Sequence, residues 1–277
     1  MTLDCPPTAN RLATVEQPAR ADEVEIARLR KDYLDLMCES LVGRLNRDPP
    51  LQQHLSDYDD AHRVNGWDWP SRAPSMIGLQ RMTNLRDECE RVLREDVPGD
   101  FLEAGVWRGG ACMMMRAVLK AYGVRNRRVI AADTYAGMPP QQIDDAETEF
   151  LRGIPEFAVS LDEVKQGFER YHLLDEQVVF LQGRFADTLP TAPVVQLAVL
   201  RLDGDTFESA RDALAMLYDK VALSGSIIVD DYFLFSGNRR AIDEFRQEHA
   251  VSEPIIRIDD YGGYWIKRAS ETIATPL

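Results

Sequence analysis

A single apolar stretch that ends in acidic residues constrains this sequence more than any other feature. Residues 197–202, Leu-Ala-Val-Leu-Arg-Leu, form a short and mostly apolar run, and Asp203-Gly204-Asp205 follows it directly. A strand that is apolar on both faces is typical of a parallel sheet covered by helices on each side. Ligands of such sheets bind beyond the carboxyl ends of the strands, which is where Asp203 and Asp205 are expected. The sequence therefore predicts a functional site around these two carboxylates.

A second strand end adds two more carboxylates. Residues 226–229, Ser-Ile-Ile-Val, form another apolar run, and Asp230 and Asp231 follow it. Two neighbouring strands would then bring four carboxylates to one edge of the sheet. Carboxylates a few ångströms apart cannot all stay ionised unless a cation lies between them. Because carboxylate oxygens suit a hard divalent ion such as magnesium or calcium, we expect a metal site here.

The remaining pattern predicts an α/β fold. Helix-length segments separate strand-like runs at residues 100–103, 128–133, 177–181, 197–202 and 226–229. This alternation is typical of a doubly wound, mostly parallel sheet. Residues 254–258 and 263–267, joined by a tight turn around Tyr261-Gly262, predict a closing hairpin that places an antiparallel strand at the edge of the sheet.

The 277 residues divide into three expected parts. Residues 1–20 contain three prolines and mixed polar residues and are expected to form a disordered tail. Residues 21–95 are interpreted as an N-terminal extension with a helix from Ala21 to about Leu45 and another from Ser75 to about Arg94. The intervening loop, residues 48–74, carries Trp67 and Trp69 and is interpreted as a lid. Residues 96–277 hold the main domain.

Composition and charge limit the kind of partner. With 32 Lys and Arg against 46 Asp and Glu, the net charge is −14, which opposes binding to nucleic acid. The four cysteines are scattered without a Cys-x-x-Cys pair, so neither a zinc ribbon nor a disulfide framework is indicated. The sequence contains neither an apolar run long enough to cross a bilayer nor a secretion signal. We expect a cytoplasmic protein that acts on a small neutral or cationic molecule.

A glycine-rich turn suggests a nucleoside cofactor. Residues 101–110 have the pattern Glu-x-Gly-x-x-x-Gly-Gly, which differs from both the dinucleotide and the triphosphate-binding loops. A nucleoside without phosphates, such as S-adenosylmethionine, is the natural occupant. Asp133 ends the next strand, where it could accept both hydroxyls of a ribose, although a lone acidic strand end is more often a cap. The two features together favour a nucleoside site.

The ordered set of these motifs resembles the macrocin O-methyltransferase family. The residues that carry the resemblance are 101–110, 132–139, 180–190, 200–209, 229–232 and 264–265, and the similarity extends from about Asp32 to the end of the chain. Members of this family use S-adenosylmethionine to methylate sugar hydroxyls on glycosylated antibiotics. The resemblance implies a class I methyltransferase fold, a Rossmann-like sheet of seven strands. It also implies a homodimer, and the helix near the N-terminus could supply its contact.

The resemblance also implies the residues that bind the cofactor. The methionine part would be lined by Glu103, Gly105, Trp107 and Gly109, the ribose by Asp133 and Thr134, and the adenine end by Phe185 and Asp187. Ser75 and Met76 match the family's segment that closes over the cofactor. Three positions depart from the family pattern: Ser75 replaces a usual Thr, Thr134-Tyr135 a usual Ser-Phe, and Arg184 a usual Trp.

The family's magnesium ligands would be Asp203, Asp230 and Asp231, and Asp205 would be its general base. A sugar hydroxyl is a poor nucleophile while it keeps its proton. A magnesium ion could stabilise the developing alkoxide, and Asp205 could take the proton. The resemblance thus implies a magnesium-dependent transfer to a glycosylated small-molecule acceptor. The acceptor stays open among a polyketide glycoside, an aminocoumarin sugar and a nucleoside sugar.

Three alternatives remain at this point. Asp203-Gly204-Asp205-Thr206 after an apolar run also imitates the first motif of magnesium-dependent haloacid-dehalogenase phosphatases. The acidic pair at Asp230 follows too soon for that family's cap and lysine motif, and the glycine-rich turn would be unexplained. A nicotinamide dehydrogenase is disfavoured by the order of the glycines. A noncatalytic role is disfavoured because four carboxylates follow two buried strands.

Overall fold

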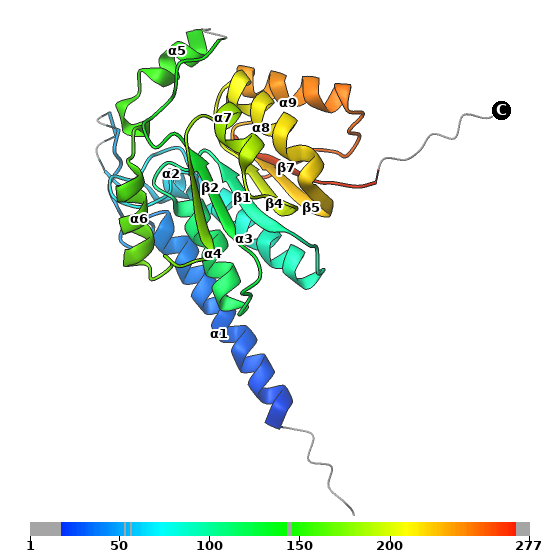
Figure 1. Ribbon diagram of the computed structural model, residues 1–277. Helices are drawn as coiled ribbons and strands as arrows, with labels where there is room; N and C mark the ends of the chain where they lie inside the picture. The colour runs from blue at the N-terminus through cyan, green and yellow to red at the C-terminus, as the bar shows by residue number, and fades with distance from the viewer. Residues whose placement is uncertain (1–17, 53, 56, 143–145, 270–277) are drawn as a thin grey trace, which may run out of the picture.

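A seven-stranded sheet forms the centre of the molecule in the computed structural model, which describes residues 18–52, 54–55, 57–142 and 146–269 (Figure 1). Its strands are β1 (Asp100–Ala104), β2 (Val129–Asp133), β3 (Val178–Gln182), β4 (Leu197–Leu202), β5 (Val221–Val229), β6 (Ile256–Arg257) and β7 (Gly263–Ile266). They lie in the order β3-β2-β1-β4-β5-β7-β6. Strands β1 to β5 are parallel, and β7 is antiparallel to both β5 and β6. The predicted doubly wound sheet and its closing hairpin are confirmed.

Helices cover both faces of this sheet. One face packs against α1 (Pro18–Leu41), α3 (Gly78–Arg94) and α4 (Gly110–Ala121), and the other against α8 (Phe207–Leu217) and α9 (Ser236–Glu248). Successive residues of β1 alternate between the two cores, because side chains of a strand point to opposite faces. Phe101 belongs to the first core and Leu102 to the second, and both are fully buried. The apolar strands of the sequence are thus explained by burial on two sides.

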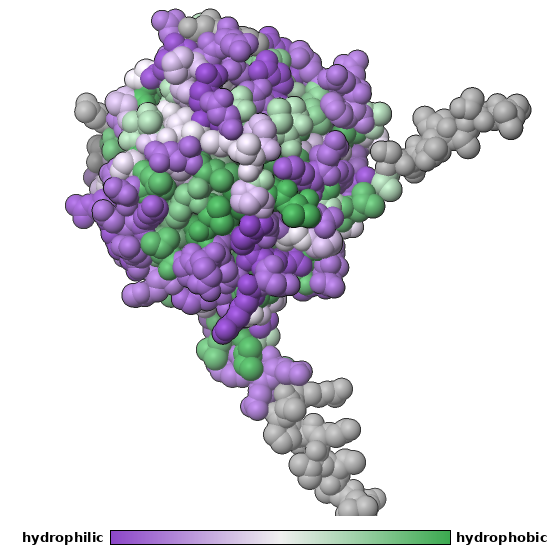
Figure 2. Space-filling view, in the orientation of Figure 1, coloured by the Kyte–Doolittle hydropathy of each residue, from purple (hydrophilic) through white to green (hydrophobic). Residues whose placement is uncertain are grey.

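The connection between β3 and β4 is short and leaves the edge of the sheet partly open. It contains α7 (Phe185–Thr188) and a 3₁₀ turn at Leu189–Thr191, and β3 is only partly buried. Figure 2 shows apolar side chains gathered over this edge. The other short helical segments are α2 (Asp60–Asn65), α5 (Ala146–Arg152), α6 (Leu161–Arg170), and 3₁₀ turns at Pro155–Phe157 and Tyr218–Lys220.

The segment interpreted from the sequence as a lid, residues 48–74, includes α2, and several of its described residues anchor it to the body of the protein. The guanidinium of Arg63 is buried and pairs with Asp68, with 2.6 Å between Nη2 and Oδ2. Arg63 also donates to the backbone carbonyls of Val42 and Asp48. The Asp48 carboxylate accepts hydrogen bonds from Ser71 and from two backbone N–H groups beyond it. Buried charges that are fully paired in this way hold a segment in one place.

Several boundaries differ from the sequence expectation for identifiable reasons. Helix α3 starts at Gly78 rather than Ser75, because the Ser75 N–H donates to the carbonyl of Leu41 and Gly78 has a φ of +74°. Strand β5 starts at Val221 rather than Ser226, and its register shifts where Leu223 and Ser224 are exposed. The missed helix α2 has a sequence signal after all: the Asp59 side chain caps it by accepting from the N–H of His62.

The N-terminal helix begins earlier than expected. Residues 18–20 of the expected tail belong to α1, and residues 1–17 lie outside the described residues. The first half of α1 projects from the body of the molecule (Figure 1). Three of its apolar side chains, Val24, Ile26 and Leu29, are more than half exposed. Within the described part of the chain, none of the helices has the length and apolar character needed to span a membrane.

Candidate active site

A cavity of about 270 Å³ opens at the carboxyl ends of β1, β2, β4 and β5. The strand ends contribute carboxylates to its wall, and residues from the extension and from the α5 region close its sides. This is the position in which α/β sheets bind ligands, at the point where the strand order reverses. The predicted location of the site is the location of this cavity.

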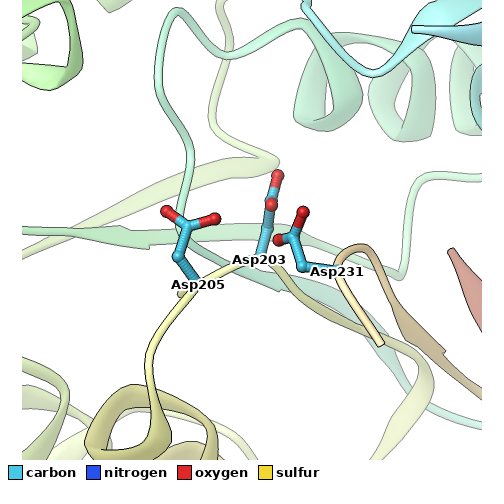
Figure 3. Close-up of side chains that lie close together, drawn as sticks. All are labelled: Asp203, Asp205 and Asp231. Atoms are coloured by element: carbon cyan, nitrogen blue, oxygen red, sulfur yellow. The ribbon is translucent and has the colours of Figure 1, made fainter. Parts of the chain in front are cut away.

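Three carboxylates meet in the cavity. Asp203 and Asp205 follow β4, Asp231 follows β5, and one oxygen from each lies within 4.8 Å of the others. Figure 3 shows the three side chains extending to the same side, with Asp203 between the other two. Asp205 has a φ of +60°, and directly after it Thr206 caps α8 by accepting from the N–H of Ser209. The turn between β4 and α8 thus sets the direction of Asp205.

The surroundings of these carboxylates disfavour negative charge. Burial, and next the charge of Asp203, raises the pKa of Asp205 to about 8. Burial and the charge of Asp205 raise the pKa of Asp231 well above its usual range. The Oδ2 atom of Asp231 is buried without a hydrogen-bond partner. Since a buried acceptor is normally satisfied, this atom and its neighbours offer ligand positions to a cation.

The Arg201 side chain, near the carboxyl end of β4, connects the cluster to the glycine-rich turn. Arg201 is 1% exposed and contacts three carboxylates: it pairs with Glu103 and Asp230, and its Nη1 lies 2.6 Å from Oδ2 of Asp203. A buried charge is tolerated only when it is paired in this way. Burial, followed by the charge of Asp203, raises the pKa of Glu103 to about 7, although Arg201 opposes the shift.

A second arginine, Arg81 of α3, reaches the same group of residues. It pairs with Asp230, and its Nε lies 2.9 Å from Oδ2 of Asp259, which precedes β7. The Asp259 carboxylate also accepts from the backbone N–H groups of Tyr261 and Gly262. Each carboxylate oxygen of Asp230 therefore accepts from an arginine. Of the four carboxylates considered from the sequence, three form the open cluster, and Asp230 lies behind them between two guanidinium groups.

The glycine-rich turn is wedged against the strand that carries the cluster. Gly105 has a φ of +95°, and a Cβ atom there would overlap the backbone oxygen of Asp203. Only glycine can occupy such a position without moving the chain. Gly109, with a φ of +88°, precedes α4, and a Cβ on Gly110 would lie 2.5 Å from that of Ser75. The turn therefore touches both the carboxylate cluster and the segment that contains Ser75.

Asp133, at the end of β2, faces the same turn. Its carboxylate accepts from the N–H of Val106 at 2.6 Å and from that of Tyr135 at 2.8 Å. Burial raises its pKa, and these backbone hydrogen bonds oppose the shift. Thr134 donates to the carbonyl of Gly137 and so fixes the turn after β2. Asp133 thus caps the turn and still lines the cavity.

Most of the cofactor residues implied by the sequence line the cavity: Ser75, Met76, Glu103, Gly105, Trp107, Asp133, Thr134 and Phe185. Gly109 lies one residue outside the lining, where it starts α4. Asp187 is exposed on α7 and does not line the cavity. Arg184, which replaces the Trp that is usual in the family, lines the cavity and contacts Glu208 at 3.3 Å.

Sequence reasoning missed the roles of Arg81 and Arg201. Arg201 carried a usable signal, because an arginine in an otherwise apolar buried strand must find carboxylate partners. Arg81 carried none, because α3 has charged residues on several sides and its partner Asp259 is 178 positions away.

The family assignment follows from comparison with known proteins. The model of the macrocin O-methyltransferase family matches residues 22–267. The chain belongs to the macrocin O-methyltransferase family. It is therefore an O-methyltransferase, and the phosphatase alternative based on Asp203 and Asp205 loses its support. The family match covers the described cavity from the Ser75 segment to β7.

Named relatives agree with this assignment. The chain is 45% identical to demethyldecarbamoylnovobiocin O-methyltransferase of Streptomyces niveus over 84% of this chain and 92% of the relative. It is 46% identical to 8-demethyl-8-(2,3-dimethoxy-α-L-rhamnosyl)-tetracenomycin-C 4'-O-methyltransferase of Streptomyces olivaceus, over 84% and 91%. The structure of the O-methyltransferase NovP superposes with a TM-score of 0.83 at 43% identity, covering 87% of this chain and all of that one. The class I methyltransferase fold is confirmed.

The Arg201 contacts lead to a prediction about stability. Replacing Arg201 by Met should leave Glu103, Asp203 and Asp230 without their shared counter-charge. We expect the free energy of unfolding to fall by about 3–5 kcal/mol, measured by urea denaturation. Arg239→Met is the control, because Arg239 forms an exposed pair with Asp243. Equal unfolding midpoints for the two variants would contradict the role given to Arg201.

Proposed function

We propose that this enzyme transfers a methyl group from S-adenosylmethionine to a sugar hydroxyl of a glycosylated small molecule, with a divalent ion, preferably magnesium, in the carboxylate cluster. One observation carries the proposal: the glycine-rich turn and the cluster form adjoining walls of a single cavity. A methyl donor held at one wall and a hydroxyl held at the other would be close enough to react. A relative whose name specifies a rhamnosyl-bearing substrate supports the choice of a glycosylated acceptor.

The cavity suits S-adenosylmethionine for reasons of charge and shape. Gly105 lets the backbone approach a ligand closely, and Asp133 lies where the two hydroxyls of a ribose could donate to its free lone pairs. Ser75 packs against the start of α4 and so covers the turn from the other side. The sulfonium and ammonium groups of the donor are cationic, and carboxylates such as Glu103 and Asp203 line the wall nearby.

The cluster suits a divalent ion. Its donors are carboxylate oxygens, which magnesium prefers, and the partnerless Oδ2 of Asp231 is a ready ligand position. Asp203 and Asp231 are the ligands that this geometry supports best. Asp230, a ligand by family resemblance, would have to give up an arginine contact in order to join them. A bound ion would stabilise negative charge on an acceptor oxygen as the proton leaves.

The chain's own residues would then place and move the proton. Asp205 lies beside Asp203 and Asp231 on a turn fixed by Thr206, so its carboxylate faces the same space as theirs. Burial and the charge of Asp203 raise its pKa, and a cation held by Asp203 and Asp231 would oppose that shift and keep Asp205 ionised, so that it could accept a proton. Asp205 would accept the hydroxyl proton, while Arg201 keeps Asp203 and Glu103 in place on either side of the reacting groups.

We also propose a homodimer with α1 in its interface. The exposed side chains of Val24, Ile26 and Leu29 lie on the half of α1 that projects from the molecule (Figure 1). Apolar side chains on a projecting helix are costly to leave in water, and a second copy of the helix could cover them. A monomer mass in solution would refute this interface.

The activity is tested with a panel of acceptors and labelled S-adenosylmethionine. Demethyldecarbamoylnovobiocin and the rhamnosylated tetracenomycin named for the relatives head the panel, and their aglycones without sugar serve as controls. We expect label in at least one glycoside and in none of the aglycones. Transfer to an aglycone, or no S-adenosylmethionine binding by calorimetry, would overturn the proposal.

The role of Asp205 gives a second prediction. Asp205→Asn keeps the shape of the side chain but removes its ability to accept a proton. Turnover should fall by about 100-fold or more, with the affinity for S-adenosylhomocysteine in calorimetry close to that of the wild type. Asp212→Asn, a change at another carboxylate of the cavity wall, is the comparison. Unchanged turnover in Asp205→Asn would exclude it as the base.

Removal of the ion gives a third prediction. EDTA should abolish methyl transfer, and added magnesium should restore it. Asp231→Asn should weaken magnesium binding by about 10-fold or more, measured by calorimetry without acceptor, because it removes the charge of a ligand. Asp230→Asn should weaken it less, since arginines already occupy that carboxylate. A rate that is insensitive to EDTA would exclude the metal.

A further inference from the structure

Apolar side chains surround the mouth of the cavity, beyond the carboxylate cluster. We name as the apolar rim six residues that line it: Met138, Phe150, Ile154, Phe157, Leu234 and Phe235. Phe150 is 68% exposed and Leu234 42% exposed, although both belong to the lining of the cavity. Large apolar side chains that are exposed at the mouth of a cavity indicate a ligand that extends outward from it.

The two halves of the apolar rim are tied together by one carboxylate. Phe150 and Ile154 lie on and just after α5, whereas Leu234 and Phe235 precede α9. Glu147 of α5 accepts from the N–H of Ser236 at 3.1 Å and from that of Gly237 at 2.8 Å, at the start of α9. A carboxylate at a helix N-terminus is a favourable contact. Residues far apart in sequence are thereby held around one opening.

The base of this region is fixed as well. The N–H of Gln142 donates to the Glu208 carboxylate of α8 at 2.6 Å, and the Trp107 indole donates to the carbonyl of Glu156 at 2.8 Å. The rings of Phe157 and Trp69 lie 5.5 Å apart. These contacts thus fix the position of the apolar rim, which continues the cavity outward from the carboxylate cluster.

The charges at the cavity disfavour a phosphorylated ligand at this surface. Arg81 and Arg201 are buried and paired with carboxylates, and Arg184 contacts Glu208. No lysine lines the cavity among the described residues. A nucleotide diphosphate on the sugar would require cations for its phosphates. An uncharged apolar group requires only the surface that the rim offers.

We propose that the apolar rim is the binding subsite for the aglycone, an apolar and ring-containing group attached to the methylated sugar. This inference rests on the proposed function, since the sugar must reach the cluster while the rest of the acceptor lies outward. Phe150 and Leu234 are its main contact residues because they expose the most apolar surface. The rim, rather than the cluster, then selects among acceptors that carry the same sugar.

The first test uses a neutral aromatic probe and needs no activity. Binding of N-phenyl-1-naphthylamine is followed by its fluorescence. S-adenosylhomocysteine is present to occupy the proposed cofactor site beside the glycine-rich turn. Phe150→Ser and Leu234→Ser should each weaken the probe's affinity by about fivefold, as expected for lost apolar contact. Leu223→Ser is the matched control, because Leu223 is 57% exposed on β5 outside the cavity lining. Equal affinities for rim variants and control would overturn the subsite.

The second test uses the glycoside that the acceptor panel identifies. The double variant Phe150→Ser/Leu234→Ser should raise KM for that glycoside by about tenfold, with KM for the methyl glycoside of the same sugar unchanged. Equal KM values of the wild type for the two acceptors, or a lower KM for the nucleotide diphosphate sugar, would overturn the subsite. A wild type that methylates no acceptor fails the proposed function instead, and the probe experiment still decides the rim.

Discussion

The structure depends on the pairing of Arg201 with three carboxylates in the interior of the sheet. An arginine that is 1% exposed would be untenable alone, and so would the carboxylates beside it. Together they place Glu103 of β1, Asp203 after β4 and Asp230 after β5 around one guanidinium group. Three neighbouring strands are thus tied at the same level. The charged groups that line the cavity therefore also hold these three strands together.

Arg81 and Arg201 do not pair with every carboxylate of the site, so carboxylates without a positive partner remain beside the paired ones. Burial, and next the charge of a neighbouring aspartate, raises the pKa of both Asp205 and Asp231; that neighbour is Asp203 for Asp205 and Asp205 for Asp231. Asp230, by contrast, lies between Arg81 and Arg201. Within the described part of the chain, two carboxylates of these strand ends, Asp203 and Asp230, pair with arginine, whereas Asp205 and Asp231 form no such pair. The proposed divalent ion would supply the positive charge that Asp205 and Asp231 lack.

The sequence predicted the features that depend on local pattern. Apolar strands ending in Asp203 and Asp230, and the glycines of residues 101–110, were sufficient for the sheet and for the position of the cavity. The interaction of Arg81 with Asp259 could not be predicted, because it joins α3 to the turn before β7 across most of the chain. The separate surroundings of Asp230 and Asp231 could not be predicted either, because they depend on Arg81, which reaches Asp230 from α3.

The contact between Gly105 and the backbone of Asp203 has an implication for how such enzymes diversify. Because the glycine-rich turn and the end of β4 interlock there, neither can accept an insertion or a bulky replacement without displacing the other. Residues 138–142 and 146–157 include no contact of that kind: the hydrogen bonds of Trp107, Gln142 and Glu147 that hold them involve side-chain atoms, not two interlocked backbones. Substitutions in residues 138–142 and 146–157 could therefore change the acceptor while the residues around Gly105 and Asp203 stay the same.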